Sequence, residues 1–315
     1  MNRREFMGST LAAGTVSEQA ARQNAPPDVT QGGTIHIERA GTGKPHAGKV
    51  LAVIEPHSDD MPIFAAGTVA KLLNEGYTGH LIRTSNDEKD SYDLSMGETV
   101  LANEKDTRVM ARELGLKQVF DLNYRNHRID DVSRVDMRAR LIFLFRLLKV
   151  DTIFSYDPWG HYEENPDHYV TAQCVESACW MAGGRLDYPE HFAAGLERHA
   201  VREKYYFARG PQFVNRVVDI SSTIDKKMEV IRANKTMIKH MVGALRDSLA
   251  ERKLRLPEIS GDDDNAARAF IRLSFRERDA ELGRKYGVQY AEAFHYIGPT
   301  DRLDGYIAKA AVPIR

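Results

Sequence analysis

The chain of 315 residues has little of what marks several classes of protein. Its two cysteines, Cys174 and Cys179, lie five apart in a predicted helix, where their side chains diverge, so neither a disulfide nor a cysteine metal site is expected. The net charge is only −1, which gives no reason to expect nucleic acid or an acidic membrane as a partner. No hydrophobic run reaches the roughly 20 residues of a transmembrane helix.

The chain also lacks the glycine fingerprint of a dinucleotide-binding fold. Its first strong strand signal, residues 50–54, is apolar without alternation, as expected of a strand covered on both faces in a parallel sheet, and no G-x-G-x-x-G follows it. Further strands are predicted from residue 81 and at 118–122 and 152–156, and helices at 63–73, 98–114, 132–148 and 166–181. This alternation predicts an α/β fold, a three-layer Rossmann-like domain with a mostly parallel sheet.

Further segments are predicted before and after these strands and helices. Residues 1–48 are interpreted as a signal-like segment and linker, and residues 49–315 as one domain that includes a C-terminal subdomain. The linker is predicted to contain a short edge strand at 34–37. Strands at 201–207 and 214–220 are predicted to form the subdomain, followed by helices at 223–245 and 266–282 and a final strand or extended tail at 291–297.

The first residues carry a feature that bears on localisation. Arg3 and Arg4 precede a short, weakly apolar run that ends at Val16, which resembles a twin-arginine export signal. This predicts a periplasmic or exported protein. No clear A-x-A cleavage site follows, and the alternative is a disordered tail on a cytoplasmic protein.

The first polar cluster, Pro56-His57-Ser58-Asp59-Asp60-Met61, comes directly after the strand at 50–54. His57 and Asp60 are three apart, so a tight turn brings both to one side, as two ligands of one divalent metal require. Asp59 then points elsewhere and can take a proton from a metal-bound water. The alternative is that Ser58 or Asp59 only caps the helix that begins near Pro62. A metal site needs a third ligand.

The second polar cluster follows the strand at 152–156 and supplies the missing imidazole. Pro166 and Asp167 can start a helix, which places His168 in its first turn. His161 and Asn165 lie in the loop before this helix. Because ligands bind at the carboxyl ends of the strands in open α/β sheets, both clusters are expected at the same edge.

Together these two clusters resemble a known family, the PIG-L/LmbE-type zinc-dependent N-deacetylases. The family's first motif, approximately (A/P)HPDDE, is matched by Pro56 to Met61, and its second, approximately HPDH, by Asn165 to His168. The resemblance covers about residues 49–241. It implies that His57, Asp60 and His168 bind zinc and that Asp59 is the general base.

Three departures from the family pattern limit what the resemblance implies. Met61 replaces a usual Glu, and Leu101 stands where an Arg often touches substrate, which weakens the case for a phosphate-bearing substrate. Asn165 replaces a His that helps to stabilise the oxyanion in the family. An Asn donates a neutral hydrogen bond but does not titrate, so His161, four residues earlier, is hypothesised to take the cationic role.

The predicted function is therefore a zinc-dependent N-deacetylase, a hydrolase that removes an acetyl group from an N-acetylated amino sugar or sugar conjugate. A zinc-bound water and Asp59 would carry the reaction, with His161 and Asn165 as further catalytic residues. Fe²⁺ or Co²⁺ also suits a His-Asp-His site. The alternatives are a noncatalytic zinc-containing sugar-binding protein and a hydrolase of another amide or ester. The only partner predicted is this small-molecule substrate, and a homo-oligomer is compatible with the sequence.

Overall fold

A single eight-stranded sheet with helices on both faces forms the core of the computed structural model, which describes residues 34–299 and 304–313. The Arg3-Arg4 segment predicted to be an export signal lies outside the described residues. The strands are β1 (His36–Glu38), β2 (Val50–Glu55), β3 (Thr78–Ser85), β4 (Gln118–Tyr124), β5 (Thr152–Tyr156), β6 (Glu203–Phe207), β7 (Arg216–Asp219) and β8 (Ala291–Ile297). The longer helices are α3 (Ala66–Asn74), α4 (Met96–Leu114), α5 (Arg134–Leu148), α6 (Pro166–Ala182), α8 (Ile224–Ala233), α9 (Lys235–Glu251), α10 (Asp263–Ile271) and α11 (Glu277–Lys285). The predicted α/β class with a mostly parallel sheet is confirmed.

The order of the strands places a topological switch point next to β2. The sheet runs β1-β7-β8-β6-β5-β2-β3-β4, so the chain leaves β2 toward β3 and β4 and then returns to place β5 on the other side of β2. Strands β2, β3, β4, β5 and β6 are mutually parallel, whereas β8 is antiparallel to its neighbours β6 and β7. The boundary between β2 and β5 is therefore a topological switch point, where ligands bind in open α/β sheets.

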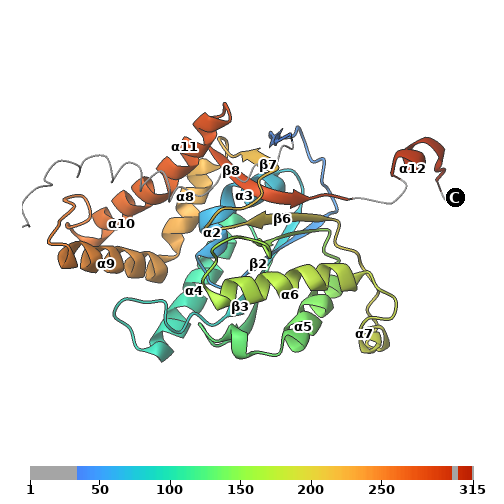
Figure 1. The fold of residues 1–315 in the computed structure, drawn as a ribbon, viewed down its shortest axis with the longest axis horizontal. Helices are drawn as coiled ribbons and strands as arrows, with labels where there is room; N and C mark the ends of the chain where they lie inside the picture. Colours follow the sequence, from blue (N-terminus) through green and yellow to red (C-terminus); the bar gives the residue numbers. More distant parts are fainter. Residues whose placement is uncertain (1–33, 300–303, 314–315) are drawn as a thin grey trace, which may run out of the picture.

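Strand β2 is buried on both faces, as its unbroken apolar run predicts. Leu51 and Val53 pack into the cluster on one face with side chains of α3, α4 and α8. Ala52 and Ile54 point to the other face, into the cluster formed with α5 and α6. Figure 1 shows α5 and α6 side by side along the sheet, and α9 to α11 gathered at one end of the molecule. The helical layers hold β2 rigidly from both sides.

The prediction of one long helix at 223–245 is wrong, because Asn234 interrupts it and separates α8 from α9. The backbone of Asn234 has ψ of 68°, which is not helical. Its buried side-chain amide donates to the carbonyl oxygen of Ser58 at 3.0 Å, and Thr236 at the start of α9 donates its backbone N–H to Asp106 of α4 at 2.7 Å. These long-range hydrogen bonds compensate for the backbone hydrogen bonds that are lost where the helix is interrupted. Helical periodicity in the sequence does not reveal them.

The C-terminal strands extend the main sheet. The strands expected at 201–207 and 214–220 are β6 and β7, and β8 lies between them. The short strand β1, close to the predicted edge strand at 34–37, pairs in parallel with β7. Cys174 and Cys179 are both buried free thiols, as expected. In the described part of the chain, no helix is long and apolar enough to cross a bilayer.

Candidate metal centre

A tight turn at the end of β2 brings His57 and Asp60 together. The backbone N–H of His57 donates to Asp60 Oδ2 at 2.8 Å, and the short helix α2 (Asp60–Phe64) begins immediately after it. Asp59 is the N-cap residue of α2, but its side chain makes no capping hydrogen bond. The capping alternative for Asp59 is therefore wrong, and its carboxylate is free for other chemistry.

The start of α6 supplies the third side chain from the neighbouring strand β5. Asn165 is the N-cap of α6, and its Oδ1 accepts from the backbone N–H of Asp167 at 3.0 Å, with Pro166 in the first turn. This cap places His168 so that its Nε2 lies 3.0 Å from Nδ1 of His57 and 3.7 Å from Oδ1 of Asp60. All three side chains are buried, and their ligand atoms lie within 4.8 Å of one another.

On each of the two imidazoles, the ring nitrogen that does not face the other ring lies next to a carboxylate. Nε2 of His57 lies 3.1 Å from Oδ2 of Asp167, and Nδ1 of His168 lies 3.1 Å from Oε1 of Glu163, although the latter contact is off the hydrogen-bonding direction. A metal bound to Nδ1 of His57 and Nε2 of His168 requires the ring protons on Nε2 of His57 and Nδ1 of His168, the nitrogens beside these carboxylates. The lone pairs of His57 Nδ1 and His168 Nε2 then face each other, and a cation between them would relieve their repulsion. Such carboxylate-backed histidines are typical of metal ligands, so the residues present fit a divalent metal.

The local electrostatics favour positive charge at this point. Burial alone would lower the pKa of His57, but hydrogen bonds to Asp167 and Asp60 raise it well above its ordinary value. Burial would raise the pKa of Asp60, whereas His168 and His57 lower it to about 2. The Tyr156 hydroxyl donates to Asp60 at 2.6 Å, and its ring stacks on His168. Asp60 is thus an anion held in place on both oxygens.

Asp59 lies beside the centre in an acidic environment. Burial, and then the adjacent Asp60, raise the pKa of Asp59 well above its ordinary value. Asp87 and Asp90 of the loop after β3 are further acidic neighbours, and with His57 they form a second group of potential ligand atoms. Asp87, however, already accepts from Arg83 at 2.8 Å and from the backbone N–H of Ser58. The His57-Asp60-His168 group is therefore the better candidate for a metal centre, and Asp59 is a carboxyl group beside it whose raised pKa increases its affinity for a proton.

The structure separates the two other residues predicted to be catalytic. Asn165 lies at the centre, with its Nδ2 3.3 Å from Nε2 of His168. His161 is exposed, and the aromatic ring beside it is that of Tyr162, at 6.3 Å between centroids. Leu101, compared with a substrate-binding Arg of the family, is 68% exposed on α4.

Sequence reasoning missed several residues at this site. Asp167, Glu163 and Tyr156 are not among the residues that the sequence predicts for the site, although each contacts a candidate ligand side chain. His127 follows β4, and its ring lies edge-on to His57, at 6.1 Å between centroids. The run of polar residues directly after β4 is the signal that could have identified His127.

Replacing Asp167 by Asn tests the support behind His57. The amide in the variant has about the volume of the carboxylate but could turn its NH₂ group toward Nε2 of His57, and the ring proton would then move to Nδ1, the nitrogen that should face the metal. Loss of such an outer-shell partner typically lowers metal affinity about 10- to 100-fold. Competition with a chelator of known affinity measures this change. An affinity equal to that of the wild type would show that Asp167 has no part in holding His57.

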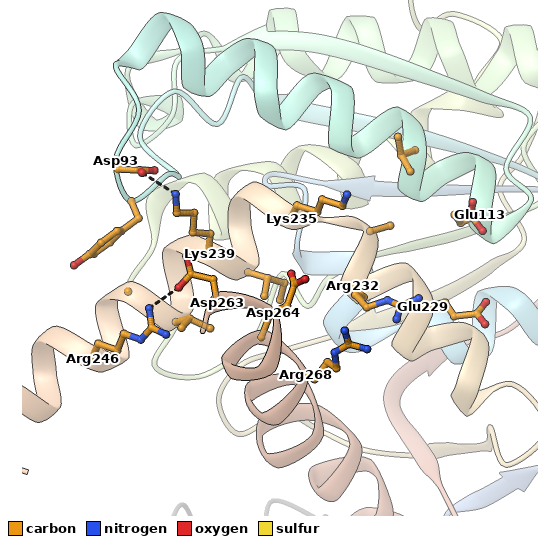
Figure 2. Close-up of a pocket in the computed structure, with 17 residues that line it drawn as sticks. Asp93, Glu113, Glu229, Arg232, Lys235, Lys239, Arg246, Asp263, Asp264 and Arg268 are labelled. Carbon is orange, nitrogen blue, oxygen red and sulfur yellow. Dashed lines mark hydrogen bonds and ion pairs between the residues drawn. The ribbon is translucent and has the colours of Figure 1, made fainter. Parts of the chain in front are cut away.

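A cavity among the described residues lies away from this centre. It has a volume of about 990 Å³ and is bordered by side chains of α4, α8, α9 and α10, as Figure 2 shows. Five cationic and five acidic side chains line it, and two of the pairs are in contact, Lys239 with Asp93 and Arg246 with Asp263, each at 2.7 Å. The lining is balanced in charge and contains none of the predicted site residues, so the cavity adds no chemistry to the metal centre.

Part of the chain is similar to known deacetylases. A family model described as PIG-L: GlcNAc-PI de-N-acetylase matches residues 52–179, a range that contains both polar clusters. The diacetylchitobiose deacetylase of Thermococcus kodakarensis is 26% identical over 191 residues, which cover 60% of this chain and 70% of that protein.

Solved structures share the fold. The N,N'-diacetylchitobiose deacetylase of Pyrococcus horikoshii superposes with a TM-score of 0.63 at 25% identity, over 79% of this chain and 84% of that one. The 4-carboxy-2-hydroxymuconate hydratase of Pseudomonas putida superposes with a TM-score of 0.58 at 19% identity, over 80% of this chain and 98% of that one. Because a hydratase has the same fold, the fold does not decide the reaction, and the site must.

Proposed function

We propose that this chain is a metal-dependent hydrolase that removes the acetyl group from an N-acetylated amino sugar or sugar conjugate, because the PIG-L family model matches residues 52–179. The similar deacetylases act, by their names, on diacetylchitobiose, which is an N-acetylated sugar. The observation that carries the proposal is the facing pair of ring nitrogens of His57 and His168, 3.0 Å apart beside Asp60.

His57, Asp60 and His168 would hold the metal, and zinc is the metal we propose. Two imidazoles and one carboxylate are a donor set of catalytic zinc sites, which keep a fourth position open. When bound, such a metal lowers the pKa of a coordinated water towards about 7 and polarises the carbonyl of the acetamide. The remaining chemistry belongs to side chains of this chain.

Asp59 moves the proton. Its carboxylate has no capping partner and its pKa is raised, so it can accept a proton from the attacking water as the C–O bond forms. The same carboxyl group then protonates the nitrogen as the C–N bond breaks, which releases acetate and a free amine. One residue thus serves as base and then as acid, and the reaction leaves Asp59 as it began.

Asn165 is positioned to stabilise the oxygen of the acetamide carbonyl. Its Oδ1 is held by the backbone N–H of Asp167, so its Nδ2 is fixed toward the metal centre, near Nε2 of His168. A fixed amide donor of this kind stabilises negative charge as it develops. The neutral amide of Asn165 therefore retains the donor function of the family's His.

Acetate release tests the proposed function. The metal-loaded protein is incubated with N,N'-diacetylchitobiose, and acetate and free amine are both measured. We expect equal amounts of the two products, a loss of release on treatment with a chelator, and recovery when zinc is added back. Binding of the sugar without release of acetate would instead identify a noncatalytic sugar-binding protein, and release only from other amides or esters would identify a different hydrolase.

A further inference from the structure

A second histidine stands beside the metal centre on a turn that is held in an unusual conformation. His127 follows β4 and has a φ of 58°, in the left-handed region that side-chain-bearing residues avoid. The preceding residue, Asn126, is fully buried, donates its side-chain amide to Asp90 at 3.0 Å, and donates its backbone N–H to Asn86 at 3.2 Å. The turn is therefore fixed by the same loop that carries the acidic neighbours of Asp59.

One carboxylate oxygen positions both His127 and a metal ligand. Oδ2 of Asp167 accepts from the backbone N–H of His127 at 2.7 Å and lies 3.1 Å from Nε2 of His57. The two imidazoles consequently lie edge-on, with 6.1 Å between centroids and 76° between ring planes. The position of His127 is thus coupled to the position of His57.

The imidazole of His127 is free to meet a substrate. The residue is exposed, and its ring forms no hydrogen bond or ion pair with the described residues. His161, by contrast, makes a backbone hydrogen bond to Pro211, and its ring contacts Tyr162 rather than the centre. Of these two histidines, only His127 lies against a metal ligand.

The conformation of the turn does not explain why a histidine stands here. Gly adopts a positive φ at no steric cost, and Asn does so more readily than most residues, so either would make the same turn. Compared with Gly or Asn, a histidine at position 127 provides an aromatic ring with one hydrogen-bond donor and one acceptor.

We propose that His127 is a catalytic residue, which donates a hydrogen bond to the carbonyl oxygen of the scissile acetamide from the His57 side of the centre. Asn165 donates from the His168 side, so the two residues together replace the donor that the family takes from the first His of its second motif. The proposal rests on the deacetylase function given above. It assigns to His127 the role that the sequence suggested for His161.

The test compares three single variants with the wild type in steady-state acetate release from N,N'-diacetylchitobiose. His127→Gly removes the imidazole and suits the positive φ, so the turn is expected to fold as before. His127→Gln restores a neutral amide donor of similar reach. Arg128→Ala is the matched control, because Arg128 is an exposed neighbour on the same turn that pairs only with Asp131 at 3.1 Å among the described residues. Metal content and melting temperature are measured for each protein.

We expect His127→Gly to lower kcat about 10²-fold, the usual cost of one oxyanion donor, with KM changed less than threefold and metal content unchanged. His127→Gln should recover at least a tenth of the wild-type kcat, and Arg128→Ala should match the wild type. A kcat of His127→Gly within threefold of the wild type, or a loss confined to KM, would overturn the inference. A larger loss in His161→Ala than in His127→Gly would overturn it too. If the wild type itself releases no acetate, it is the proposed function that fails.

Discussion

Replacing Asp59 by Asn should lower kcat for acetate release by about 10²- to 10⁴-fold, the range expected when a general base is removed. The substitution keeps the shape of the side chain, and Asp59 is not one of the three proposed metal ligands. Folding should not suffer either, because the raised pKa of Asp59 reflects burial and repulsion from buried neighbours, Asp60 first among the charges. The variant should therefore bind metal as the wild type does and fail only in turnover.

The measurement is kcat under saturating substrate, together with the metal content and melting temperature of the same preparations. Asp93→Asn is the matched control, because Asp93 is an exposed carboxylate that pairs with Lys239 away from the centre. A kcat of Asp59→Asn within threefold of the wild type would remove Asp59 from the mechanism. Loss of metal in the Asp59→Asn variant would instead show that Asp59 acts as a ligand.

Replacing Lys227 by Met should lower the free energy of unfolding by about 3–5 kcal/mol, the range for breaking a buried ion pair by removing one partner. Nζ of Lys227 is fully buried between Asp279 of α11, at 2.5 Å, and Glu292 of β8, at 2.8 Å. Glu292 also accepts from the backbone N–H groups of Gly67 and Thr68 at the start of α3. Met fills the space but leaves Glu292 without its cation and Asp279 with only the partly exposed Arg278, at 3.1 Å.

Chemical denaturation measures this effect, with Lys226→Ala as the matched control on the same helix. Lys226 is on the surface and pairs with Glu229 at 2.7 Å, so its loss should change the free energy of unfolding by no more than about 0.5 kcal/mol. A change below about 1 kcal/mol in Lys227→Met would show that the ion pairs do not hold α8 and α11 to the sheet.

The sequence predicted the architecture and the metal group because both depend on local patterns. The unbroken apolar run of β2 indicated a strand buried on both faces, and the two polar clusters followed strands whose carboxyl ends share one edge. The spacing of His57 and Asp60 on one turn, and of His168 in the first turn of a helix, is also local. Such features depend on a few consecutive residues and are visible in one chain.

What the sequence could not give depends on contacts between distant segments. Asn234 breaks a helix because its amide reaches Ser58, 176 residues away. His127 is placed beside His57 by Asp167, 40 residues further along the chain, and these two contacts distinguish it from His161. A single sequence does not show these pairings, so it favours His161, which lies nearer to the second motif along the chain.

The measurement that tests the central claim most directly is the metal content of the purified wild type beside His168→Ala, by elemental analysis. The account predicts about one zinc or other transition metal per chain in the wild type, none in His168→Ala, and the wild-type value in His161→Ala, whose imidazole lies outside the centre. That result would join two clusters 111 residues apart into one site. Absence of metal from the wild type after incubation with zinc, or retention of metal by His168→Ala, would contradict the account.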